Sequence, residues 1–99
     1  MELSQKIETK LIRTADTRLR LDSCLIYQTK DRLLQPSGNY GMEIVLTDRE
    51  GCCRERCRNL AENYPDAVTL IRLFAERGIL PEAMQERLRG TGQAGKRML

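Results

Sequence analysis

The chain has 99 residues, of which 40% are hydrophobic and 31% are charged, with a formal net charge of +3. These values are typical of one small globular domain and exclude a disordered chain. Three tyrosines and one phenylalanine are its aromatic residues, so we expect a mainly aliphatic core. There is no histidine, which removes the usual general base, a common metal ligand and any Ser–His or Cys–His triad.

The apolar runs along the chain are three or four residues long at most, too short to span a membrane. The first residues, Met-Glu-Leu-Ser-Gln-Lys, lack the basic and apolar regions of a signal peptide. We therefore expect a cytoplasmic protein with reduced thiols, no membrane contact, no cofactor and no enzymatic activity.

The N-terminal segment fits two patterns. Leu3, Ile7 and Leu11 recur at helical spacing, but residues 7–11 also alternate as in a strand. Residues 15–17 (ADT) resemble a turn, so we interpret residues 5–13 as the first arm of a hairpin.

Three further strands are predicted downstream. Alternation begins at Leu19 and continues to residue 30, although Cys24 and Ile26 add apolar side chains to the polar face. Residues 35–39 (QPSGN) are typical of a loop. Residues 40–47 alternate most clearly, and residues 53–60 follow as another antiparallel strand after the polar connection 47–51.

The last third predicts two helices. Pro65 suits a first helical position and Asp66 suits the positive end of the helix dipole. Gly78 is expected to end this helix in the left-handed conformation, with Ile79 packing back on it. A short second helix begins at Leu80-Pro81-Glu82, points Met84 and Leu88 inward, and ends near Gly90.

These elements predict an α+β fold, in which an antiparallel sheet of three or four strands is covered on one face by two C-terminal helices. Residues 1–89 form the single domain, and residues 90–99, rich in glycine and basic, form a flexible tail.

Three segments carry a family resemblance: residues 39–44 (NYGMEI), residues 64–66 (YPD) and residues 73–82 (LFAERGILPE). Together they resemble a family of short uncharacterised proteins, a domain of unknown function, from clostridia-like Firmicutes. The resemblance covers roughly residues 19–89. It departs at Leu80, where a capping Thr or Ser is usual, and at residues 86–89, where an acidic–aromatic pair is usual. It implies the fold and a bacterial origin, and no activity.

Three of the four cysteines lie in residues 52–57 (CCRERC). On a helix, Cys53 and Cys57 would share a face and could share a metal ion. On a strand they lie about 13 Å apart, too far for one ion or one disulfide. The preceding Gly51 and the alternation favour the strand, so we predict no metal site. A Cys-based metal-binding domain remains an alternative.

The other face of the same predicted strand carries Arg54, Arg56 and Arg58, and Arg49 could extend this row. Guanidinium groups suit carboxylates and phosphates. These four arginines are therefore the candidate binding site for an anionic or acidic partner. The alternative is a solvated face that pairs with Glu43 across the ladder.

We therefore expect a non-catalytic protein-interaction or regulatory module that binds a protein partner or a second copy of itself. Residues 51–99 carry nine basic and six acidic residues, whereas residues 1–50 carry eight of each. Nucleic acid is accordingly an alternative partner, although the arginine row lacks the interleaved aromatic side chains that stack bases.

Overall fold

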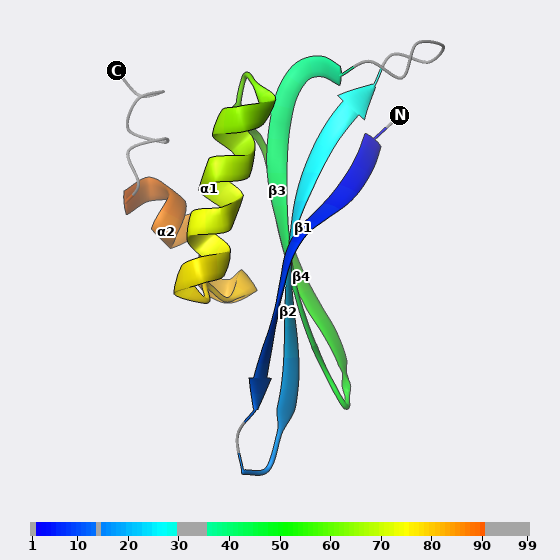
Figure 1. Cartoon of the computed structure of the whole chain (residues 1–99), viewed down its shortest axis with the longest axis vertical. Coiled ribbons are helices and arrows are strands. Elements are labelled where there is room, and N and C mark those ends of the chain that lie inside the picture. Colours follow the sequence, from blue (N-terminus) through cyan, green and yellow to red (C-terminus); the bar gives the residue numbers. More distant parts are fainter. Residues whose placement is uncertain (1, 14, 30–35, 91–99) are drawn as a thin grey trace.

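The computed structural model describes residues 2–13, 15–29 and 36–90, and within them the α+β fold is confirmed (Figure 1). Four strands form one antiparallel sheet in the order β1-β2-β3-β4. Two α-helices and a short 3-10 helix follow. The strands are β1 (Glu2–Arg13), β2 (Arg18–Thr29), β3 (Pro36–Asp48) and β4 (Gly51–Ala61), and the helices are α1 (Tyr64–Arg77), η1 (Pro81–Ala83) and α2 (Met84–Gly90).

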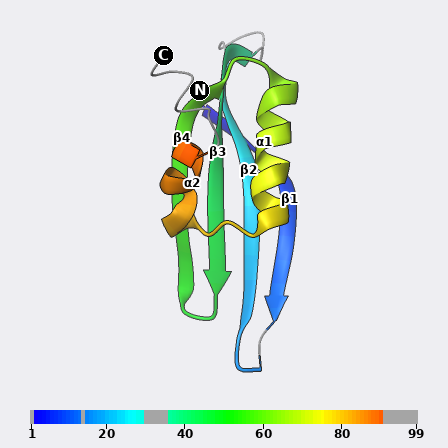
Figure 2. The ribbon, with the colours of Figure 1, turned by 90° about the vertical axis from the view of Figure 1, so that its left-hand side faces the viewer.

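All the helices lie on one face of the sheet, with α1 over β1 and β2 and α2 over β3 and β4 (Figure 2). The register places Leu21 opposite Leu46, Leu25 opposite Met42 and Tyr27 opposite Tyr40 on this helix-covered face. None of the helices in the described ranges lies on the opposite face. Because β-strands alternate, every second residue of each strand is directed to the helix-free side.

The core lies between the sheet and the helices. In the sheet, Leu25, Met42 and Ile44 are completely buried. From the helices, Phe74 of α1 and Met84 at the start of α2 expose at most 2% of their surface. Burial of these apolar side chains is the main stabilising contribution to the fold.

Both ends of α1 carry the signals that helices need. At its start the side chain of Asn63 accepts a hydrogen bond from the backbone N–H of Asp66 at 2.9 Å. At its end Gly78 is left-handed, with φ 65°, as predicted. The backbone N–H of Ile79 then donates to the carbonyl of Phe74 at 3.1 Å, which folds Ile79 back onto the last turn.

Most of the elements predicted from the sequence are present in the described residues. The N-terminal segment is a strand. The short helical segment expected from Leu80 begins as η1 at Pro81 and continues as α2, with Met84 and Leu88 buried. The loop predicted at 35–39 is wrong from Pro36 onward, because β3 begins there; proline is tolerated at the first residue of a strand, where its missing N–H breaks no central pairing. Residue 35 and all of the predicted tail except Gly90 lie outside the described residues.

Within the described ranges, none of the helices has both the length and the hydropathy needed to cross a membrane.

Candidate functional site

The helix-free side of the sheet has an excess of basic side chains, and we call it the arginine face. Residues directly opposite each other in the ladder share a side, so the register assigns its members. Among the described residues its basic members are Lys6, Arg13, Arg18, Arg20, Arg54, Arg56 and Arg58, and its acidic members are Glu2, Asp22 and Glu43. Basic residues therefore outnumber acidic ones by more than two to one.

Strand β4 supplies three of these arginines. Arg54 lies opposite Val45 and Arg56 lies opposite Glu43. Arg58 follows on the same side, where it contacts Glu2. The cross-strand pairing with Glu43 that the sequence left open is therefore present, and it engages Arg56.

Glu2, Glu43, Arg56 and Arg58 form an ionic network across the sheet, which we call the edge network. Arg56 Nε donates to Glu43 Oε2, and its Nη1 donates to Glu2 Oε1 at 3.0 Å. Arg58 binds both oxygens of Glu2, at 2.7 and 3.2 Å. Glu43 is only 5% exposed, so Arg56 neutralises a charge that burial would otherwise penalise.

The network lowers the pKa of Glu2, mainly through the hydrogen bond from Arg58. A carboxyl group whose pKa falls on folding stabilises the fold above its unfolded pKa, and this stabilisation is lost as the pH falls through the folded value. We therefore expect Glu2→Gln to destabilise the protein at pH 7 and to matter progressively less below about pH 4.5.

Urea unfolding of both proteins at pH 7 and at pH 3 measures this difference. In an Arg58→Met background the pH dependence of the Glu2→Gln effect should shrink. A constant difference between Glu2→Gln and the natural chain at all pH values would contradict the assignment.

Glu2 lies on one edge strand and Arg58 on the other, so the sheet must coil to bring them together. Two irregularities of the β3–β4 ladder permit this. The register shifts between Tyr40 and Met42, and Asn59 of β4 is left-handed with φ 59°. Such a bulge bends and twists a strand. The coiling closes the arginine face at this end and buries Cys24 and Ile26 on it.

A second ionic cluster lies beside the edge network. The buried carboxylate of Asp22 accepts a hydrogen bond from Thr9 Oγ1 at 2.7 Å and pairs with Arg20 Nε at 3.2 Å and Lys6 Nζ at 3.6 Å. Arg20 and Lys6 remain half exposed. The negative charge of Asp22 is therefore buried beneath the side chains of Lys6 and Arg20, which remain accessible to solvent.

Arg54 and Arg49 are the predicted site residues that the edge network leaves out. Arg54 lies 3.9 Å from Glu43 Oε2, and its side chain is 54% exposed. Arg49 lies in the β3–β4 turn, which Asp48 stabilises by accepting hydrogen bonds from the N–H groups of Glu50 and Gly51 at 2.8 and 3.0 Å. With Arg13 and Arg18 of the arginine face, Arg49 lines a pocket at the hairpin tips.

The cysteines are distributed over both sides of the sheet. Cys53 and Cys57 lie opposite Leu46 and Met42 on the helix-covered side, whereas Cys24 and Cys52 lie on the arginine face. Burial raises the pKa of Cys24, and nearby Glu43 raises it further, so this thiol is a poor thiolate ligand. Within the described residues no group of three or more Cys, Asp or Glu side chains is placed to hold a metal ion.

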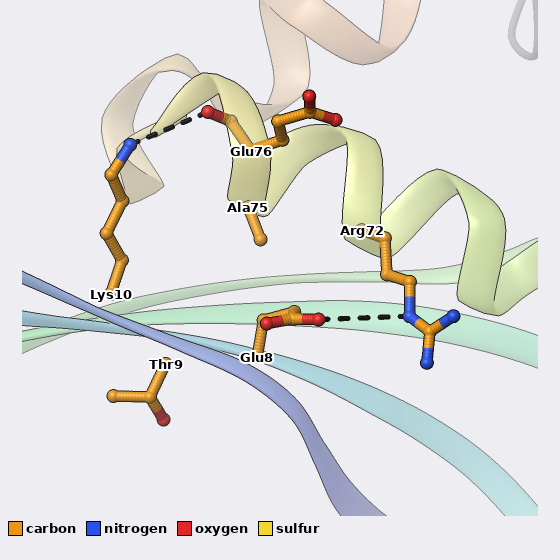
Figure 3. Close-up of a pocket in the computed structure, with 6 residues that line it drawn as sticks. All are labelled: Glu8, Thr9, Lys10, Arg72, Ala75 and Glu76. Atoms are coloured by element: carbon orange, nitrogen blue, oxygen red, sulfur yellow. Dashed lines mark hydrogen bonds and ion pairs between the residues drawn. The ribbon is translucent and has the colours of Figure 1, made fainter.

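A mixed-charge groove of about 420 Å³ lies between β1 and α1, lined by Glu8, Thr9, Lys10, Arg72, Ala75 and Glu76 (Figure 3). Its charged groups contact one another across the groove. Glu8 faces Arg72 at 3.8 Å, and Lys10 Nζ donates to the carbonyl of Glu76 at 3.5 Å. The groove thus joins the helix to the sheet edge and selects for neither sign of charge.

Sequence reasoning missed Glu2 and the basic residues Arg13, Arg18 and Arg20. The alternation of β2 could have identified Arg18 and Arg20, since they share parity with Asp22. No local signal identifies Glu2, because its partners are 54 and 56 residues away.

Comparison of the chain with protein-family models, with curated proteins and with solved structures finds no match. The resemblance to short Firmicutes proteins stays a prediction.

Proposed function

We propose that this chain is a non-catalytic interaction module of the bacterial cytoplasm that binds an acidic surface of a partner protein through the arginine face. The observation that carries this is the charge excess on the side of the sheet that none of the described helices covers. Guanidinium groups on such a surface steer an acidic partner and bind its carboxylates in bidentate fashion.

The ionic contacts divide the arginines into two groups. Arg56 and Arg58 hold the buried Glu43 and the N-terminal Glu2, so their main contribution is to shape the face. Arg54 has a single long ion pair, to Glu43, and no ion pair of Arg49 appears among the described residues. In the proposal Arg49 and Arg54 make the direct contacts, and Arg56 and Arg58 support them.

Nucleic acid would be attracted by the same charge. In the described part of the chain, however, the aromatic side chains lie on the other side of the sheet. Tyr27 and Tyr40 pack 6.1 Å apart, Tyr64 packs against Tyr40, and Phe74 is in the core. The arginine face therefore lacks the stacking surfaces of single-strand binders, which favours a protein partner.

The test compares a fluorescent peptide rich in Glu and Asp with a random DNA duplex, at about 50 mM salt where phosphate contacts are strongest. We expect the peptide to bind and the double variant Arg49→Gln/Arg54→Gln to weaken this binding at least about tenfold, since the loss of even one charge-assisted hydrogen bond costs about 1.5–3 kcal/mol.

The matched control is Arg72→Gln/Arg77→Gln, which removes the same charge from the helix side. An equal loss of peptide affinity in both double variants would show that binding depends on net charge alone, and this would overturn the proposal. Tighter binding of the duplex than of the peptide would show that the arginine face binds nucleic acid and not an acidic protein.

A further inference from the structure

Three arginines meet at the end of the arginine face where both hairpins turn. The β1–β2 turn and the β3–β4 turn lie at the same end of the sheet (Figure 2). Arg13, Arg18 and Arg49 line a pocket of about 300 Å³ there, together with Ala15, Asp16 and Thr17.

The arrangement of these arginines is unfavourable in the absence of an anion. Arg13 and Arg18 are directly opposite each other in the β1–β2 ladder, and like charges in that position repel. Arg49 adds a third positive charge from the other hairpin. Over the described residues no ion pair is formed by any of the three, although Asp16 lies in the same lining. Elsewhere on this face Arg20, Arg56 and Arg58 each have a carboxylate partner.

We propose that Arg13, Arg18 and Arg49 bind the phosphoryl group of a phosphate monoester carried by the acidic partner. This proposal rests on the proposed function and names one chemical group that the partner presents.

A monoester fits this pocket better than other anions for two reasons. It carries a charge of about −1.5 to −2 near pH 7 and three acceptor oxygens, which match three guanidinium groups. A nucleic-acid phosphodiester carries one charge and would need a longer track of contacts. The pocket volume is at the small end of ligand sites, sufficient for one compact group.

The test measures binding of one short acidic peptide in two forms, with serine and with phosphoserine, by calorimetry. We expect the phosphorylated form to bind at least about tenfold more tightly at pH 7.5, because one or two added charge-assisted hydrogen bonds supply that much binding free energy. Arg18→Gln and Arg49→Gln should each abolish most of that preference. Arg77→Gln, an exposed helix arginine on the other side of the sheet, should leave it unchanged.

Two further measurements separate the pocket from general electrostatics. Asp16→Asn removes the negative charge from the lining and should strengthen binding of the phosphopeptide. Lowering the pH to 5 should weaken the preference, because the second ionisation of a phosphate monoester has a pKa of about 6. All the substituted side chains are exposed, and unchanged urea midpoints would verify that the variants fold.

The sources of the phosphoryl group are distinguished by competition with inorganic phosphate and with duplex DNA. Displacement of the phosphopeptide by inorganic phosphate at equal concentration, with the same dependence on Arg18, would assign the pocket to the free phosphate ion and overturn the assignment to a partner's phosphate monoester. Equal binding of the two peptide forms, an equal loss in Arg77→Gln, or stronger displacement by duplex DNA would overturn the proposal.

The same measurements distinguish a failure of the phosphate-pocket proposal from a failure of the proposed function. If the serine peptide binds and depends on Arg54 while phosphorylation adds nothing, the pocket is wrong and the acidic-partner proposal stands. If neither peptide binds, both the phosphate pocket and the acidic-partner proposal are wrong.

Discussion

Replacing Gly41 with alanine is expected to destabilise the fold by about 3 kcal/mol or more, the upper range for overpacking. A Cβ at this position would lie 2.4 Å from the backbone carbonyl oxygen of Cys57 and 2.9 Å from Cα of Arg58. Both atoms belong to the backbone of β4, so no side-chain rotation relieves the contact. Glycine is required here because β4 crosses close over β3 as the sheet coils.

The measurement is the urea midpoint, with Gly78→Ala as the comparison. Gly78 is left-handed, so alanine there costs about 1 kcal/mol of backbone strain, and its Cβ meets only the flexible end of Lys10 at 3.4 Å. The Gly41 variant should be clearly the less stable of the two. The opposite order would show that β4 can move away from Gly41 at little cost.

The second large effect is expected for Arg56→Met, which removes the cation bound to the buried carboxylate of Glu43. Breaking a fully buried ion pair costs about 3–5 kcal/mol, because a charge is left without its partner. The Arg56 side chain is 38% exposed, so solvent reduces the effect here, and we expect about 2 kcal/mol.

A double variant provides the decisive control. Adding Glu43→Gln removes the unpaired charge, so Arg56→Met/Glu43→Gln should be more stable than Arg56→Met alone. Arg54→Met, which removes a half-exposed arginine 3.9 Å from the same carboxylate, should cost under about 1 kcal/mol. Thermal unfolding of the three variants compares them, and an Arg54 effect as large as that of Arg56 would contradict this division of roles.

Much of the fold is predictable from local patterns. The alternation of residues 40–47, the Pro65 start and the Gly78 end of α1 depend on neighbours within a few residues, and each is present in the structure. The start of β3 at Pro36 was missed because the turn-forming composition of residues 35–39 outweighed a strand pattern that carries no alternating apolar residues there.

Strand β2 shows a feature of burial that local sequence patterns do not predict. Cys24 and Ile26 disturb its alternation in the sequence, yet both lie on the helix-free side as their parity requires, and both are buried. Their burial depends on the coiling of the sheet, which brings β4 and the start of β1 over them. A pattern of hydrophobic residues identifies a face, but it does not report the curvature of the sheet that covers that face.

The same limit applies to the candidate site. The row of Arg54, Arg56 and Arg58 is visible in the sequence, but which members are already engaged depends on Glu2, more than fifty residues away. The sequence offered Arg49 as an extension of that row, and it gave no sign that the turn also brings Arg49 to Arg13 and Arg18. Which side chains remain available to a partner is decided by tertiary geometry.

The bond between Glu2 and Arg58 also has a consequence for the order of folding. Successive hairpins of this sheet join strands that are adjacent in sequence, and such short loops close at low entropic cost. The Glu2–Arg58 bond joins residues 56 positions apart, and its two ends meet only after β2 and β3 are paired between them. It therefore belongs to a late stage of assembly, and it adds a long-range contact to the N-terminal end of β1, which already pairs with β2 from Glu2 opposite Gln28 onward.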